Sequence, residues 1–164
     1  MYGLSKTTLK QIDCNLTLGR IKTNVRKDFI IAPHYSAVYA NVGNELWNEV
    51  QNNLKSGKYE PKLPITIEVP KKSYLTRPGS ILTPIDRFIY QALVDVIAPL
   101  AEEQLDRSKT FSNILLNPDP NYLMFEQSHI CWKRMQQSIK NLCKDKSLLY
   151  AIKTDVASYF ENLY

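Results

Sequence analysis

Apolar residues recur at helical spacing near the start of the chain. Over residues 4–28 they fall three or four positions apart, at Leu9, Ile12 and Leu16. The charged residues of this stretch are mostly basic, namely Lys6, Lys10, Arg20, Lys22, Arg26 and Lys27. The pattern predicts a basic amphipathic helix that is broken near Gly19. Its charged face is either solvated or follows a phosphate backbone.

The next stretch divides into an irregular part and a clear helix. Residues 29–42 are short apolar pieces around Pro33 and fit either a loop or a strand. Apolar residues then follow one another every four positions, which predicts a helix over residues 44–54. These residues are Val42, Leu46, Val50 and Leu54. We expect Gly57 to end the helix and Trp47 to lie in the core rather than to act as a stacking platform.

A β-hairpin with basic residues near its tip is predicted for residues 65–82. Residues 65–69 alternate β-branched and polar side chains, as in a strand, and Pro70 ends this strand. Residues 71–80 are typical of a turn, and Ile81-Leu82 returns as a short strand. Three cations lie around the turn, Lys71, Lys72 and Arg77. Lysine offers a compact charge and arginine a planar fork, so together they suit a triphosphate. The alternative is an ordinary solvated hairpin tip.

The segment Thr83-Pro84-Ile85-Asp86 predicts the start of a long helix. Threonine caps, proline suits the first helical position, and the aspartate makes the first turn acidic. One face of this helix is apolar, formed by Ile85, Phe88, Ile89, Ala92, Val96 and Leu100. Pro99 is expected to kink or end it. Arg87 and Gln91 lie about one turn apart on another face. Arg87 either pairs structurally with Asp86 or faces a template strand, and the spacing favours the structural pair.

The remaining chain alternates between irregular and helical patterns and then leads into a single acidic residue. Residues 105–125 are typical of turns and loops, whereas helical spacing returns over residues 126–144. The expected buried stripe of this helix is Cys131, Met135, Ile139 and Leu142. Residues 148–152 predict a strand that leads to Asp155. That carboxylate is either a helix cap or part of a polar site, because a buried carboxylate needs a cation or hydrogen-bond donors.

Charge and cysteine content narrow the classes of function. The 164 residues are enough for one ordinary domain and carry a net charge of +5. Residues 1–80 hold twelve Lys/Arg and six Asp/Glu, a balance of +6, whereas the remainder holds nine and ten, a balance of −1. A basic front half suits a polyanionic partner, although a solvated basic surface is commoner. The three cysteines lack metal-ligand spacing, and no apolar run suits a membrane span or a secretory signal. We therefore expect a cytoplasmic protein with reduced thiols and no membrane partner.

Several familiar catalytic motifs are missing from the sequence. It has no glycine-rich dinucleotide motif, no P-loop, and no Cys or His pairs at zinc-binding spacing. His129 has no partner at ligand spacing and is expected on the surface or as a satisfied core histidine. The candidate chemistry therefore lies in the basic hairpin, in the helix that follows it, and at Asp155.

The order of these features resembles the N-terminal part of a bacterial reverse transcriptase. A basic hairpin with Arg77-Pro78 is followed by the helix start at residues 86–93, by a helix that carries Trp132, and by an apolar strand before Asp155. The likeness runs from about Tyr59 to the end of the chain. Group II intron and retron enzymes share this order, and the sequence of the motifs is most similar to that of the defence-associated or "unknown group" reverse transcriptases.

The resemblance implies a magnesium site at the end of the sequence. Asp155 would be the first catalytic aspartate and would bind both Mg²⁺ ions, with the backbone carbonyl of Val156 as a further ligand. Phe160 would pack under the incoming sugar and exclude a ribose 2′-OH. The implied reaction is nucleotidyl transfer from a dNTP to a primer 3′-OH by two-metal catalysis.

The resemblance also assigns binding residues upstream. Lys72 and Arg77 would grip the triphosphate of the incoming dNTP, and Lys71 would do so if the register shifts by one. Arg87 and Gln91 would line the channel of the RNA template, to which a DNA primer is paired.

The implied fold is α+β and incomplete. It comprises a helical extension over residues 1–57, a mostly helical fingers subdomain with the basic hairpin over 58–149, and the first palm strand over 150–164. The family needs a second acidic pair, and the sequence ends nine residues after Asp155, so we expect a fragment that is inactive alone. Residues 110–113 lack the arginine that intron enzymes carry after the long helix, which weakens an intron role. The alternative function is a non-catalytic RNA-binding or interaction module that retains only the fingers.

Overall fold

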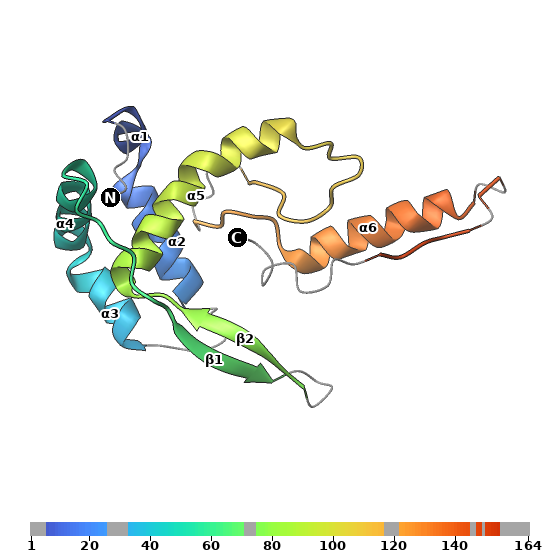
Figure 1. The fold of residues 1–164 in the computed structure, drawn as a ribbon. Coiled ribbons are helices and arrows are strands. Elements are labelled where there is room, and N and C mark those ends of the chain that lie inside the picture. Colours follow the sequence, from blue (N-terminus) through green and yellow to red (C-terminus); the bar gives the residue numbers. More distant parts are fainter. Residues whose placement is uncertain are drawn as a thin grey trace.

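The computed structural model describes residues 6–25, 33–70, 75–116, 122–144, 147–148 and 150–154. Helices account for most of this part, and two strands form one small antiparallel sheet, so the fold is α+β. The elements in chain order are α1 (Lys6–Gln11), α2 (Cys14–Val25), α3 (Pro33–Asn41), α4 (Gly43–Lys55), β1 (Ile65–Pro70), β2 (Thr76–Ile81), α5 (Pro84–Gln104) and α6 (Ser128–Leu142). Figure 1 shows α1 to α5 gathered together, with the hairpin and α6 extending from them in separate directions.

The N-terminal helix is broken before Cys14 and not at Gly19, which corrects the sequence prediction. The carboxylate of Asp13 accepts a hydrogen bond from the backbone N–H of Leu16 at 3.1 Å, so Asp13 caps the start of α2. Gly19 lies inside α2, where a Cβ atom would overlap the Tyr122 ring. The glycine is therefore explained by close packing of an aromatic ring against the helix, a contact that the local sequence does not reveal.

Residues 33–41 form helix α3, so the expectation of loop or strand for this stretch is wrong there. Pro33 is the first helical residue, a position where the missing backbone N–H carries no cost. Tyr39 is fully buried, and its hydroxyl donates a hydrogen bond to the backbone carbonyl of Pro84 at 2.9 Å. This contact joins α3 to the first residue of α5.

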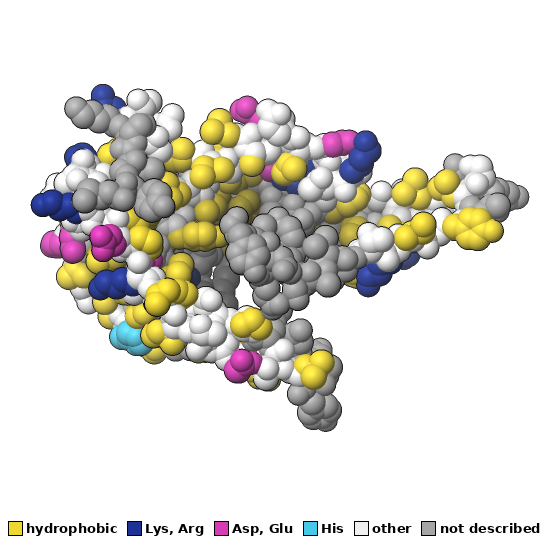
Figure 2. All heavy atoms as spheres, in the orientation of Figure 1, with side chains coloured by type: hydrophobic (Ala, Val, Ile, Leu, Met, Phe, Trp, Pro, Cys, Tyr) yellow, Lys and Arg dark blue, Asp and Glu magenta, His cyan; other side chains and the backbone are white. Residues whose placement is uncertain are grey.

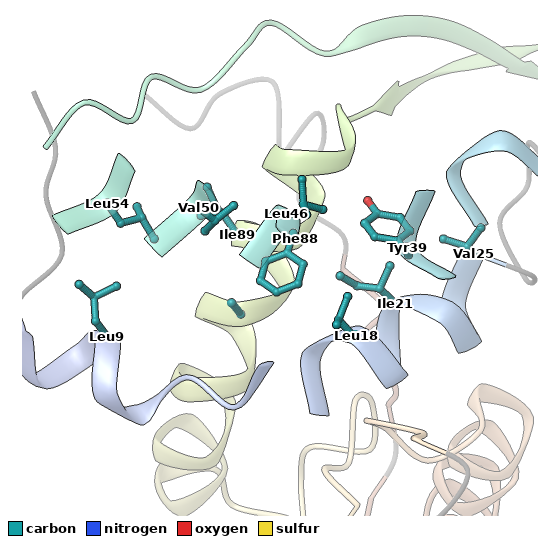
Figure 3. Packing of buried hydrophobic residues seen from close by; sticks show 11 residues of the cluster. Leu9, Leu18, Ile21, Val25, Tyr39, Leu46, Val50, Leu54, Phe88 and Ile89 are labelled. Atoms are coloured by element: carbon teal, nitrogen blue, oxygen red, sulfur yellow. The ribbon is translucent and has the colours of Figure 1, made fainter. Parts of the chain in front are cut away.

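The hydrophobic core lies between α1, α2, α3, α4 and the first half of α5 (Figure 3). The predicted helix over 44–54 is confirmed as α4, and Gly57 follows it with a positive φ of 65°. The buried cluster comprises Leu9, Leu18, Ile21, Val25, Tyr39, Leu46, Val50, Leu54, Phe88, Ile89 and Ala92. Trp47 packs against this cluster with its ring centroid 5.4 Å from that of Phe88, as expected for a core residue.

The predicted hairpin is confirmed, with a shorter connection than expected. Strands β1 and β2 pair in antiparallel register from Ile65 opposite Ile81 to Pro70 opposite Thr76. Residues 76–80, which the sequence analysis gave to the turn, belong to β2. Residues 71–74, which follow β1 in the sequence, lie outside the described residues. Figure 1 shows the paired strands leading away from the helices.

Helix α5 begins as predicted and continues further than predicted. Thr83 caps it by accepting the Asp86 backbone N–H, and Pro84 is its first residue. The helix runs through Pro99 to Gln104, so Pro99 does not end it. Proline removes one backbone hydrogen-bond donor from the helix. In the next turn, Glu102 accepts hydrogen bonds from Arg107 and from the backbone N–H of Leu115. The apolar face is buried only in its first half, because Leu100 is 62% exposed.

The C-terminal part departs from the predicted pattern in two ways. The helix predicted over 126–144 is present as α6, but Ile139 and Leu142 are exposed, and only Cys131 of its expected stripe is buried. Residues 150–154, predicted to continue a strand, adopt no regular structure. Cys14, Cys131 and Cys143 are free thiols. Within the described ranges, no helix has the length and apolar character needed to cross a bilayer.

Because only the first half of α5 is buried, substitutions in its two halves should change the free energy of unfolding by different amounts. Phe88 is fully buried, so Phe88→Ala should lower the free energy of unfolding by about 3–5 kcal/mol through lost burial and a residual cavity. Leu100→Ala on the same helix should change it by less than about 0.5 kcal/mol. Urea denaturation followed by circular dichroism measures both values. Equal losses in the two variants would mean that the apolar stripe is buried along its whole length.

Candidate functional site

The first half of α5 is the best defined part of the candidate site, because it carries two predicted residues and follows the basic hairpin. Arg87 and Gln91 lie on this helix, and the backbone of Arg77 lies in β2 opposite Val69. Lys71 and Lys72 lie outside the described residues. So do three further predicted site residues, Asp155, Val156 and Phe160. Of the predicted set, the structure thus brings Arg87 and Gln91 onto one helix and gives the strand position of Arg77.

Asp86, next to Arg87, is a buried structural residue. Its side chain accepts hydrogen bonds from the Tyr59 hydroxyl at 2.5 Å, from the Thr83 hydroxyl at 2.5 Å and from the backbone N–H of Lys62 at 3.3 Å. The residue is only 7% exposed, so these donors replace the water that a carboxylate would otherwise bind. These contacts hold Tyr59 and Lys62, which precede β1, and Thr83, which follows β2, against the start of α5.

The phenol of Tyr59 responds to this environment. Burial raises the pKa of Tyr59, and the hydrogen bond to Asp86 and the negative charge of that carboxylate raise it further. Tyr59 therefore stays a neutral donor to Asp86 throughout the physiological range. The sequence favoured a structural pair of Arg87 with Asp86. Asp86 does have a structural role, and its partners are Tyr59, Thr83 and Lys62.

Gln91 belongs to a second buried network, which the sequence analysis did not foresee. Asp95 accepts hydrogen bonds from Arg20 Nη1 at 2.7 Å, from the Thr17 hydroxyl at 2.8 Å and from Gln91 Nε2 at 2.7 Å. The side chains of Arg20 and Asp95 are only 6% and 4% exposed. The network joins α2 to α5. A signal was present in the sequence, since Asp95 interrupts the apolar run from Leu93 to Ile97 and a buried carboxylate requires partners.

A cavity of about 570 Å³ lies beside Gln91, between α5 and the chain that leads into α6. Its lining comes from Asn24 of α2, from Tyr90, Gln91 and Val94 of α5, and from residues within 123–129. Tyr90 is 62% exposed and offers an aromatic ring. The amide NH₂ of Gln91 also lies 3.5 Å from Met124 Sδ. An aromatic ring beside side-chain amides suits a flat, polar ligand such as a nucleobase.

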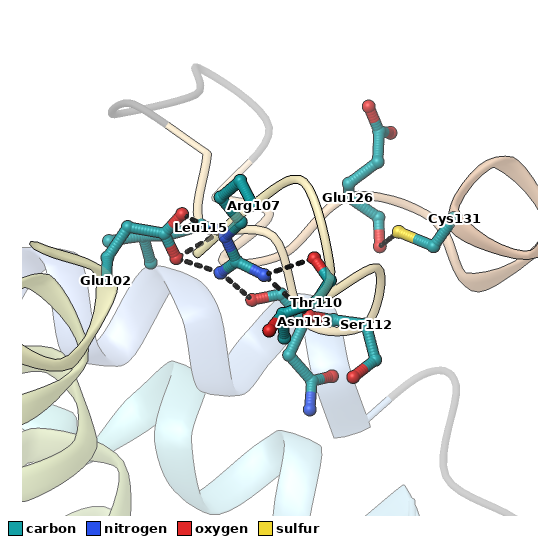
Figure 4. A network of polar contacts seen from close by, with 8 residues as sticks. All are labelled: Glu102, Arg107, Thr110, Ser112, Asn113, Leu115, Glu126 and Cys131. Carbon is teal, nitrogen blue, oxygen red and sulfur yellow. Dashed lines mark hydrogen bonds and ion pairs between the residues drawn. The ribbon is translucent and has the colours of Figure 1, made fainter. Parts of the chain in front are cut away.

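The segment after α5 is held by one arginine (Figure 4). Arg107 forms a two-point ion pair with Glu102 and donates to the backbone carbonyls of Thr110, Ser112 and Asn113 at 3.3, 2.9 and 3.1 Å. The hydrogen bond from Arg107 is the main reason why the pKa of Glu102 lies below its ordinary value. No sequence pattern predicts this set of contacts, because three of the acceptors are backbone carbonyls, which do not depend on side-chain type.

Metal ligands and relatives give no independent assignment of the site. Within the described ranges, no three His, Cys, Asp or Glu side chains come together as a metal-binding group. His129 is exposed, as expected. Comparison with protein-family models, with curated proteins and with solved structures found no match. The function of this chain is therefore inferred from its own residues and their arrangement.

The Arg20–Asp95 pair predicts strong coupling between two core positions. Asp95→Ala should lower the free energy of unfolding by about 3–5 kcal/mol, because it leaves the Arg20 guanidinium buried without its partner. The double variant Arg20→Met with Asp95→Leu should regain at least half of that loss, since Arg20 Nε already lacks a partner in the described part. Urea denaturation of the single and double variants measures the coupling. Additive losses would contradict it.

The Glu102–Arg107 pair predicts a loss of stability in acid. Because the folded pKa of Glu102 is lowered, its contribution is fully present above the ordinary glutamate pKa of about 4.3 and is lost as the pH falls through the folded pKa. The stability difference between the wild type and Glu102→Gln should thus be constant from pH 7 to 5 and shrink at lower pH. Glu103→Gln, at an exposed neighbouring position, is the control. A difference that grows in acid would refute this assignment.

Proposed function

We propose that this chain forms the fingers and the first palm strand of an RNA-directed DNA polymerase of the bacterial, defence-associated type. The reaction is transfer of a deoxynucleotide from a dNTP to the 3′-OH of a DNA primer paired with an RNA template. The observation that carries the proposal is the fixation of α5 by Asp86. Its hydrogen bonds to Tyr59 and Thr83 tie both ends of the basic hairpin to the helix that carries Arg87.

The hairpin is the proposed binding surface for the triphosphate. It is a two-stranded ribbon whose register runs to Pro70 opposite Thr76, with Arg77 next to Thr76 in β2. Lys71 and Lys72 follow β1 directly in the sequence. Two lysines directly after β1 and an arginine in β2 favour an anionic ligand, because charge-assisted hydrogen bonds to phosphate are about twice as strong as neutral ones.

The template would run along the exposed side of α5. Arg87 is half-buried, and Tyr90 beside it is 62% exposed. Gln91 was expected to line the template channel, but its NH₂ group donates a hydrogen bond to Asp95. We assign its role to shaping the cavity next to Tyr90, with the carbonyl oxygen of its amide left as an acceptor.

The catalytic centre would be completed by the C-terminal residues. Asp155 and the carbonyl of Val156 offer oxygen ligands of the kind that Mg²⁺ prefers. The bound ions would supply activation of the attacking hydroxyl and stabilisation of the leaving pyrophosphate. Phe160 would exclude a ribose 2′-OH and so favour dNTP over rNTP.

Binding of a nucleotide tests the proposal directly. The 164-residue protein is titrated with a fluorescent dNTP in the presence of Mg²⁺. The triple variant Lys71→Gln, Lys72→Gln, Arg77→Gln should bind at least about tenfold more weakly, since one lost charge-assisted hydrogen bond is worth about 1.5–3 kcal/mol. The charge-matched control is Lys10→Gln, Lys55→Gln, Lys58→Gln, which changes three exposed lysines on α1 and around the end of α4.

The control should bind the nucleotide within about twofold of the wild type. Equal weakening in the two triple variants would reduce the effect to net charge and overturn the assignment of the hairpin. A wild-type protein that binds single-stranded RNA but no triphosphate would overturn the polymerase proposal in favour of a non-catalytic RNA-binding module.

A further inference from the structure

Helix α6 carries basic residues and no acidic one. Over its fifteen residues it holds Lys133, Arg134 and Lys140, without a single Asp or Glu. Figure 1 shows α6 pointing away from the helices around the core, and most of its side chains are exposed. Figure 2 shows Lys and Arg side chains next to hydrophobic ones on this projecting part. The helix thus presents a basic surface with apolar neighbours to solvent.

The two lysines form a stripe on one face of α6. Lys133 and Lys140 are seven residues apart, which is about two helical turns and about 10 Å along the axis. Both are exposed, and neither side chain forms a hydrogen bond or ion pair with another described residue. Cys131 is buried and Met135 is half-buried, and helical geometry puts both on the opposite face from the lysines. The stripe is therefore the side that a partner can reach.

An aromatic residue borders this stripe. Trp132 is 57% exposed and precedes Lys133, so its ring is available beside the charges. Gln136 and Gln137, both exposed, lie between the two lysines along the helix. Cations that bind phosphates, an indole that stacks on a base and amides that hydrogen-bond base edges are the groups that hold a single-stranded nucleic acid.

We propose that the Lys133–Lys140 stripe and Trp132 of α6 bind single-stranded RNA outside the hairpin and α5. The inference rests on the proposed function for the identity of the strand and adds a second contact surface to it. RNA fits better than a lipid surface. A helix that lies in a membrane interface presents apolar residues to the bilayer. Ile139 and Leu142 are exposed, but helical geometry puts them on the face of Cys131 and Met135, away from the lysines. The exposed residues between the two lysines include two glutamines.

The salt dependence of RNA binding tests the lysine stripe. A labelled, unstructured 20-nucleotide RNA is titrated at several salt concentrations with the wild type and with Lys133→Gln/Lys140→Gln. For a single strand the slope of log K against log salt changes by about 0.7 per phosphate contact, so the variant should lose about 1.4. The matched control is Lys55→Gln/Lys58→Gln, which removes two exposed lysines near the end of α4 and should leave the slope unchanged.

Trp132 supplies a second readout. Trp132→Leu should weaken RNA binding about fivefold or more, because stacking of one base on an aromatic ring is worth about 1–3 kcal/mol, and Trp132→Phe should restore most of it. Because the side chain is exposed, thermal unfolding of both variants should match the wild type. An unchanged slope in the lysine variant, or equal binding of the leucine and phenylalanine variants, overturns the inference.

The same variants separate this inference from the proposed function. If α6 is not an RNA surface, the lysine variant binds RNA as the wild type does, while loss of dNTP binding in the hairpin variant still supports the polymerase assignment. If the stripe instead serves a membrane, the wild type binds vesicles of phosphatidylcholine and phosphatidylserine at 3:1 but not RNA. That outcome also overturns the inference.

Discussion

The position of the hairpin depends on the hydrogen bonds that the buried carboxylate of Asp86 accepts. Two strands alone are marginally stable in water, and this sheet has no third strand among the described residues. Polar contacts hold the end of the sheet that lies next to α5. Asp86 binds Tyr59 and Lys62 ahead of β1 and Thr83 after β2. The two ends of the ribbon therefore meet at one side chain on the first turn of α5, so the direction of the hairpin is set by that turn.

Two further acidic residues of α5 extend this arrangement along the helix. Asp95 binds Arg20 and so joins α2 to α5, and Glu102 binds Arg107 and so holds the irregular segment after the helix. The three carboxylates thus connect α5 to three different parts of the chain. This matters because the apolar core reaches only the first half of α5. Beyond Ala92 the helix is positioned mainly by Asp95 and Glu102, and Glu102 lies in the turn directly after Pro99.

Sequence patterns predicted the elements whose causes are local and missed those whose causes are distant. The cap at Thr83, the alternation in β1 and the four-residue spacing in α4 are properties of short segments, and all three are confirmed. Gly19 was misjudged because its reason is the ring of Tyr122, about a hundred residues away. The exposure of Leu100 was missed because periodicity shows which face is apolar but not how far the covering helices reach. For the candidate site, the sequence predicted residues by type and order, whereas the partners of Gln91 are visible only in the fold.

The net charge of a chain segment is a poor guide to the surface that it presents. Residues 81–164 have a balance of −1, which by itself argues against a polyanionic partner. Yet several of these acids bind donors of the protein itself, namely Asp86, Asp95, Glu102, Asp106 and Glu126. The lysines of α6 have no such partners in the described part of the chain. Because exposed charges interact only within a Debye length of about 8–10 Å, a ligand near α6 responds to Lys133 and Lys140 and hardly to the acids near the core. The basic character of α6 therefore follows from its own residues, which include no acid, and the net charge of the whole segment does not reveal it.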